Sequence, residues 1–355
     1  MPISLPNFRE RFHELVLSFL WRQWSAVGVA GQARTDDDWV IDPEALLLLT
    51  TTFGRRDPRL FDEVLDWLST EGGSINLQRL KNLQTTHQLG HPGVLAAMAA
   101  TVGLRAPQAK WRNLSREFTV PLGARTKEEM ASFRRSGPVY EIPEKPELLF
   151  PGIPVMGEAD ELFLAFGWLR ERVQLRGLSI PPNPHLPTNL LFKLRALFGL
   201  QARAEIMACL LCSEADHPAQ IATLTGYFPR TVQLALNEMA RSGHVLTGRE
   251  AREKRFHLRK EDWGFLAKAP ERRFPQWVNW GALFAALDGV SRTLDTPGLD
   301  TASPALQAIE FRNVLEKMSP ALRYSGLGWG FQTSEEMAGE ELVQSLLNDF
   351  TQLLD

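Results

Sequence analysis

Apolar positions recur at helical spacing along most of the chain, so the sequence predicts a mainly α-helical protein. Proline and glycine mark where the apolar runs begin and end. Strand-like alternation is confined to two short runs between residues 244 and 258. Outside the central part of the chain, the predicted helices cover residues 8–24, 43–53, 58–68, 75–83, 158–176, 278–294, 304–318 and 335–354.

The stretch 202–260 is predicted to hold three short helices and a hairpin. The first helix, 202–212, carries one apolar stripe. Asp216 is the expected N-cap of the second helix, with Pro218 in its first turn. Gly226 ends this helix because a residue without a Cβ enters the left-handed region at no steric cost.

The third helix of this stretch, 229–242, has two different faces. One face has core spacing and is expected to pack against the first two helices. That face carries Val232, Ala235, Leu236 and Met239. The other stripe has side chains whose donors and acceptors suit base edges and phosphates in a major groove. It carries Arg230, Thr231, Gln233, Asn237 and Arg241.

After this helix, two alternating runs joined by a charged turn predict a β-hairpin that forms a wing. Residues 227–260 hold eight Lys or Arg against three Glu, a net charge of +5, whereas the whole chain has a net charge of −3. This local positive charge is what phosphate neutralisation requires. The wing side chains expected to contact the DNA backbone or the minor groove are Arg249, Arg252, Lys254 and Arg255.

This segment resembles the winged helix-turn-helix of MarR or ArsR type that is found in bacterial transcriptional regulators. The resemblance covers about 60 of the 355 residues and implies sequence-specific binding of double-stranded DNA by a homodimer. The expected fold is therefore mainly α and multi-domain, with a central winged helix-turn-helix made of three helices and a two-stranded β wing. The alternative is an antitoxin-like or adaptor protein whose winged and helical domains bind a protein partner.

Composition suggests four regions. Residues 1–135 form a helical N-terminal domain, whose order of helices resembles a degenerate second winged-helix copy, and residues 136–189 form a proline-rich linker with one helix. Residues 190–268 form the DNA-binding domain. Residues 269–355 form an acidic helical domain suited to dimerisation or partner binding, because residues 286–355 hold eleven acidic and four basic side chains.

The chain has ordinary proportions of hydrophobic (44%) and charged (23%) residues. It has no apolar run long enough to span a membrane and no signal peptide. These features predict a cytoplasmic protein. The two cysteines, Cys209 and Cys212, form a CxxC inside a predicted helix. A zinc site would need two more ligands, and a redox pair is usually exposed at a helix N-terminus, so buried packing is favoured over either chemistry. Nucleotide-binding, hydrolase and metalloprotease motifs are absent from the sequence, which predicts a non-enzyme without cofactor or metal.

Overall fold

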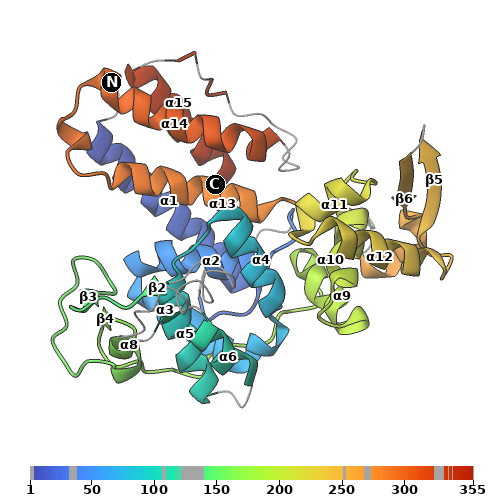
Figure 1. Cartoon of the computed structure of the whole chain (residues 1–355), viewed down its shortest axis with the longest axis horizontal. Helices are drawn as coiled ribbons and strands as arrows, with labels where there is room; N and C mark the ends of the chain where they lie inside the picture. Colours follow the sequence, from blue (N-terminus) through green and yellow to red (C-terminus); the bar gives the residue numbers. More distant parts are fainter. Residues whose placement is uncertain are drawn as a thin grey trace. The chain divides into compact units, whose positions relative to one another are not determined.

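The computed structural model describes residues 4–31, 38–105, 109–117, 119–120, 140–250, 253–267, 273–323, 332–334, 336–337 and 339–354. The protein is mainly α-helical, as predicted, and its described strands form short two-stranded sheets (Figure 1). The chain divides into two compact units. Unit 1 comprises Met1–Ala26, Arg34–Asp42 and Pro182–Asp355, and unit 2 comprises Val27–Ala33 and Pro43–Pro181.

The helices of unit 2 are α2 (Pro43–Phe53), η1 (Gly54–Arg56), α3 (Pro58–Glu71), η2 (Gly72–Ser74), α4 (Leu77–His87), α5 (Pro92–Arg105), α6 (Ala109–Glu117) and α8 (Glu161–Ala165). Proline or a side-chain cap sets the start of five helices in unit 2: α2, α3, α4, α5 and α8. Two parallel strand pairs accompany them: β1 (Thr119–Val120) with β2 (Tyr140–Glu141), and β3 (Glu147–Leu148) with β4 (Trp168–Leu169). A fully buried ion pair, Arg79 to Glu44 at 2.7 Å, joins α4 to α2.

The predicted helix over residues 158–176 is wrong, because the helical turn is confined to α8. Asp160 caps α8 by accepting from the N–H groups of Leu162 and Phe163. Gly167 then takes a φ of +79°, and a Cβ there would lie 2.5 Å from Pro143 Cδ. At Gly167 the chain therefore leaves the helix and enters β4. The close approach to Pro143 prevents the helix from continuing, although the helical spacing of apolar residues continues in the sequence.

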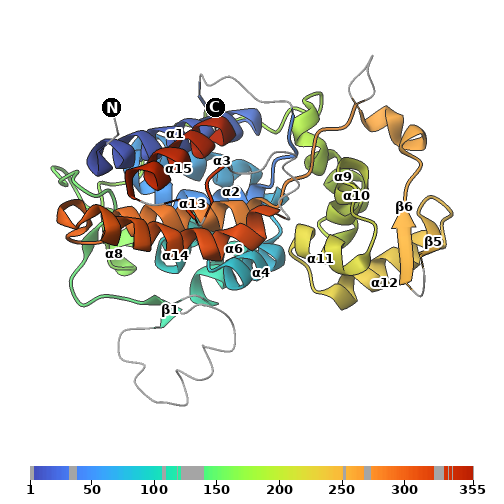
Figure 2. The same ribbon diagram turned by 90° about the horizontal axis from the view of Figure 1, so that it is seen from above.

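One part of unit 1 is a group of helices drawn from both ends of the sequence: α1 (Leu5–Ala26), α13 (Trp280–Leu294), η5 (Leu299–Thr301), α14 (Pro304–Arg323) and α15 (Gly339–Leu354). The helix α1 packs against α13 and α15 (Figure 2). Phe12 meets Phe350 edge to face at 5.3 Å between ring centroids, and Phe19 meets Phe284 at 6.0 Å.

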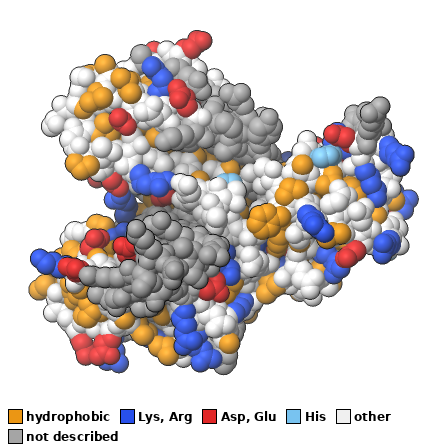
Figure 3. Space-filling model, in the orientation of Figure 1, with side chains coloured by type: hydrophobic (Ala, Val, Ile, Leu, Met, Phe, Trp, Pro, Cys, Tyr) orange, Lys and Arg blue, Asp and Glu red, His pale blue; other side chains and the backbone are white. Residues whose placement is uncertain are grey.

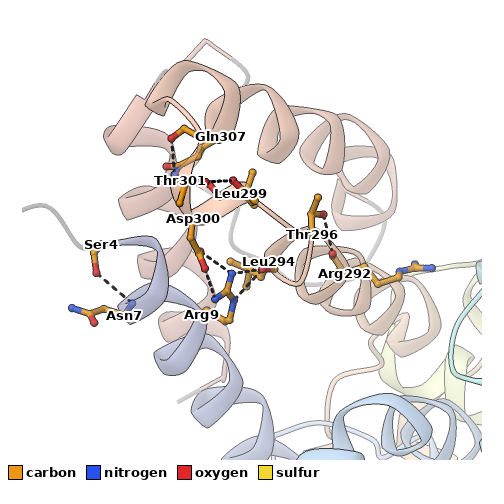
Figure 4. A network of polar contacts seen from close by, with 12 residues as sticks. Ser4, Asn7, Arg9, Arg292, Leu294, Thr296, Leu299, Asp300, Thr301 and Gln307 are labelled. Atoms are coloured by element: carbon orange, nitrogen blue, oxygen red, sulfur yellow. Dashed lines mark hydrogen bonds and ion pairs between the residues drawn. The ribbon is translucent and has the colours of Figure 1, made fainter. Parts of the chain in front are cut away.

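Polar contacts fix the start of α1 within this group. The Arg9 guanidinium donates to the carbonyl of Leu294 and forms an ion pair with Asp300 at 2.8 Å (Figure 4). Residues 269–355 share unit 1 with α1, because α1 buries its apolar face against them.

The rest of unit 1 contains the predicted helices and hairpin of the central stretch. Its elements are η3 (Pro187–Asn189), α9 (Leu190–Phe198), α10 (Ala202–Cys212), α11 (Pro218–Thr225), α12 (Pro229–Ala240), β5 (Leu246–Glu250), β6 (Glu253–His257) and η4 (Lys260–Leu266). The strands β5 and β6 pair antiparallel. The helix α10 is buried from Ala204 to Cys212, on more than the single stripe that the sequence predicted, because α9, α11 and α12 all pack against it.

The caps of α11 differ from the prediction at one end and agree at the other. His217, and not Asp216, is the N-cap, and its ring accepts from the N–H of Ala219 at 3.2 Å. Gly226 ends α11 with a φ of +74°, as predicted. Only the residues Gly226–Phe228 separate α11 from α12, and Pro229 supplies the fixed φ with which α12 begins.

Candidate nucleic-acid interface

The helix α12 buries one face and exposes the other. Val232 and Leu236 are fully buried and Ala235 is nearly so, which agrees with the predicted core face. On the other face Arg230, Thr231 and Arg241 are exposed, whereas Gln233 and Asn237 are half-buried. The structure thus brings the five predicted α12 side chains onto one side of the helix, away from its core contacts.

The hairpin of β5 and β6 carries a concentration of positive charge near its turn. Arg249 and Lys254 are directly opposite each other in the strand register, and both are exposed. Like charges in this position repel each other, so the pair is stabilised when an anion lies against it. Arg252, the fourth predicted wing side chain, lies outside the described residues.

A side-chain hydrogen bond connects the hairpin to α12. The ammonium of Lys254 donates to Asn237 Oδ1 at 2.8 Å and lies 4.9 Å from the centroid of the Phe256 ring. Phe256 is fully buried and lies two residues from Lys254 on the same strand face. The hairpin and the outward face of α12 therefore meet at this bond, and their exposed side chains are taken together as the candidate surface.

Arg255 is positioned differently from the other predicted wing cations. Its guanidinium is half-buried and forms ion pairs at 3.0 Å with both Asp216 and Glu253. The N–H of Phe256 donates to the carbonyl of Asp216 at 2.9 Å, so β6 is tied at two successive residues to the loop before α11. Arg255 thus holds the hairpin against the helices.

The remaining cations of this surface differ in how their charge is neutralised. Arg230, Arg241 and Arg249 form no ion pair with any residue that the structure describes. Lys260, by contrast, pairs with Glu214 at 3.3 Å. Lys and Arg side chains gather in Figure 3 over the part of the surface where Figure 1 shows α12, β5 and β6. Uncompensated cations on one surface attract a polyanion.

A buried polar network, which the sequence analysis did not predict, supports the helices beneath this surface. Arg195 of α9 and Glu205 of α10 are both buried, and the guanidinium donates to the carboxylate at 2.7 and 3.0 Å. The hydroxyl of Tyr227 donates to the other carboxylate oxygen at 3.3 Å. The network ties α9 and α10 to the turn before α12; its only sequence signal was a Glu within an apolar run.

Two exposed apolar side chains were also not predicted from the sequence: Leu234 on α12 and Phe228 at its N-cap. Leu234 is 55% exposed and Phe228 is 66% exposed. Helical spacing places Leu234 on the outward stripe, since it is four residues after Arg230 and three before Asn237. Its place could have been found by projecting every residue of the helix, polar or not, around the helix axis.

Cys209 and Cys212 are buried, form no disulfide and pack in the core around α10, which agrees with the buried packing favoured from the sequence. Burial raises the pKa of the Cys209 thiol to about 12, and burial raises the pKa of Cys212 as well. Within the described ranges, His, Cys, Asp and Glu do not cluster in threes that could hold a metal ion. Of the helices in the same ranges, none has both the length and the apolar character needed to cross a bilayer.

Comparison of the chain with known protein families, with curated proteins and with solved structures finds no match. The function is therefore inferred from the geometry of this surface alone.

Proposed function

We propose that α10, α11, α12 and the β5–β6 hairpin are a winged helix-turn-helix that binds double-stranded DNA, and that the protein is a transcriptional regulator. In this proposal α12 enters the major groove and the hairpin is the wing. The two helices α11 and α12, joined by a three-residue turn that begins with Gly226, have the connectivity of a helix-turn-helix.

The observation that carries the proposal is the hydrogen bond from Lys254 to Asn237. It places the cationic face of the wing beside the outward face of α12. A helix in the major groove and a wing on the adjoining backbone would then contact one duplex at the same time. Charge repulsion between Arg249 and Lys254 would be relieved by a phosphate between them.

The proposed roles follow from side-chain chemistry and exposure. Arg230, Thr231, Gln233 and Asn237 would read base edges, because they carry the donors and acceptors that fit the major-groove pattern. Arg241, Arg249 and Lys254 would bind phosphates. Arg252 belongs to the same proposal by its place in the sequence, and Arg255 would position the wing through its ion pairs.

We further propose that two copies bind DNA as a homodimer. A two-fold dimer presents two α12 helices to half-sites about one helical turn apart, which predicts a palindromic site. The acidic residues after position 286 would be repelled by the DNA backbone, so the helices α13–α15 are suited to contacts with a second copy or with a protein partner.

Selection of bound fragments from genomic DNA, at two salt concentrations, tests the proposal. The wild-type protein is compared with an Arg230→Glu/Arg241→Glu variant. Arg11→Glu/Arg172→Glu is the matched control, because both of its side chains are exposed and the change in net charge is the same, but they lie on α1 and after β4. Both variants are first checked for wild-type helicity and unfolding.

The proposal predicts one discrete motif that is enriched by the wild type and by the control, and lost by the Arg230→Glu/Arg241→Glu variant. Weak binding without a motif that disappears at the higher salt concentration would refute it, because non-specific binding is almost wholly electrostatic. Equal loss in both variants would also refute it. The adaptor alternative then predicts a protein that co-purifies regardless of the charges on α12.

A further inference from the structure

Leu234 lies within the outward face of α12, between two cations. It follows Arg230 by four residues and precedes Arg241 by seven, so the three side chains lie along one stripe of the helix. More than half of the Leu234 side chain is exposed. The neighbouring apolar residues Val232 and Leu236 are instead fully buried, so Leu234 is not needed for the core on which α12 packs.

The surrounding charge restricts what could cover Leu234. Arg230 and Arg241 form no ion pair with a described residue. A second copy of the chain docked on this stripe by a two-fold axis would bring these cations against each other, since such an interface uses the same patch on both copies. A polyanion complements the charges, so duplex DNA is the occupant that the stripe favours.

The base edges exposed in the major groove carry one apolar group that a leucine side chain can contact. Thymine is the only one of the four DNA bases that presents a methyl group there, and aliphatic side chains contact it without a hydrogen bond. We propose that Leu234 packs against the 5-methyl group of a thymine in each half-site, which makes the bound sequence thymine-specific at that position. This inference rests on the DNA binding proposed above and adds a base identity to it.

The position of Leu234 along α12 agrees with this role. It is the sixth residue of a twelve-residue helix that begins at Pro229. Leu234 lies between Arg230 and Asn237 along the helix, and we propose base contacts for both of these residues. Arg230, one turn earlier on the same stripe, is then placed to contact the adjacent base pair.

The test compares the selected duplex with a copy in which every thymine of the motif is replaced by uracil. This replacement removes the methyl groups and leaves all hydrogen-bonding edges unchanged. The wild-type protein is expected to bind the uracil duplex about fourfold more weakly per methyl contact, the factor that corresponds to burying one methylene-sized group. Leu234→Ala is expected to bind both duplexes equally.

Leu197→Ala is the matched control, because Leu197 on α9 is 59% exposed and lies outside α12. It should keep the preference for the thymine duplex. If the wild type binds the thymine and uracil duplexes equally, the inference is overturned but DNA binding is not. The inference is also overturned if Leu234→Ala still prefers the thymine duplex. A motif without thymine overturns it too. If no duplex is selected by the wild type, the proposed function itself fails.

Discussion

Lys254 of the hairpin donates to Asn237 of α12 at 2.8 Å, so the wing and the helix meet through a side-chain hydrogen bond. The bond uses the carbonyl oxygen of Asn237 and leaves its amide N–H groups as the donors for any further partner. The same lysine lies over the buried ring of Phe256, which fixes its stem against the hairpin. The hydrogen bond thereby connects the hairpin, for which we propose phosphate contacts, to a residue for which we propose base contacts.

Loss of this hydrogen bond should change stability little and DNA binding more. We expect Lys254→Ala and Asn237→Ala each to lower the free energy of unfolding by about 1 kcal/mol or less, with a similar coupling in the double variant. Lys254→Ala should also lower the slope of log affinity against log salt by about 1, because one phosphate contact is lost. Urea unfolding and binding titrations measure the two effects.

Lys145→Ala is the control for this prediction. Lys145 is exposed and lies in unit 2, between β2 and β3, so its loss changes the net charge equally without touching the wing. An unchanged salt slope in Lys254→Ala, or the same change in Lys145→Ala, would contradict a specific phosphate contact.

Two of the wing arginines, Arg249 and Arg255, should respond differently to substitution. Arg255→Ala removes a half-buried guanidinium from two carboxylates and is expected to lower the free energy of unfolding by about 1–2 kcal/mol. Arg249→Ala removes an exposed side chain and should change it by less than about 0.5 kcal/mol while weakening DNA binding. Chemical denaturation followed by binding assays separates the cases, and equal destabilisation would show that Arg249 also holds the hairpin.

The sequence located α11 and α12 closely because their boundaries depend on nearby residues. Pro218, Gly226 and Pro229 each fix a backbone angle at a helix end without help from the rest of the chain. The outward and inward faces of α12 followed from spacing alone. The expected role of Asp216 failed, because its carboxylate is engaged by Arg255, which is 39 residues away.

Long-range packing explains the features that could not be predicted. The packing of α1 with α15 depends on contacts such as Phe12 with Phe350, which local spacing does not reveal. The buried pair of Arg195 and Glu205 likewise requires two helices to be placed first. The sequence does not distinguish the four predicted wing cations from one another. In the structure Arg255 differs from the others, because its ion pairs hold the hairpin against the helices.

The buried pair beneath the interface should be a strong determinant of stability. Glu205→Ala leaves the Arg195 guanidinium buried without its carboxylate, which is expected to lower the free energy of unfolding by about 3–5 kcal/mol. An Arg195→Met/Glu205→Leu variant removes both charges and should recover most of that loss. Urea unfolding at constant pH measures both variants, and a double variant no more stable than Glu205→Ala would mean that the network has a role beyond charge compensation.

In unit 2, His91 is expected to make the free energy of unfolding depend on pH in the mildly acidic range. Its ring meets Trp168 at 5.0 Å and Tyr140 at 5.4 Å between centroids, edge to face, and the Arg55 guanidinium lies over the same Trp168 ring. Burial, and then the positive charge of Arg55, lower the pKa of His91 from 6.5 to about 4. Its Nδ1 accepts from the N–H of Val94 in the first turn of α5.

The sign of the effect follows from proton binding. Between pH 6.5 and about 4 the unfolded chain protonates His91 and the folded chain does not, so the unfolded state binds more protons and stability falls as the pH falls. The loss should reach on the order of 2–3 kcal/mol at the acidic end of this window. Above pH 6.5 the group contributes no pH dependence.

His91→Asn is the variant that isolates this titration, because asparagine keeps an acceptor for the Val94 N–H and has no proton to gain. The difference in free energy of unfolding between wild type and variant should shrink as the pH falls from 6.5 to 4. NMR titration of the His91 ring, assigned by its absence from the variant, should give a pKa well below 6.5. A pKa near 6.5, or parallel stability curves for the two proteins, would show that the ring is solvated and that the aromatic cluster does not exclude the charged form.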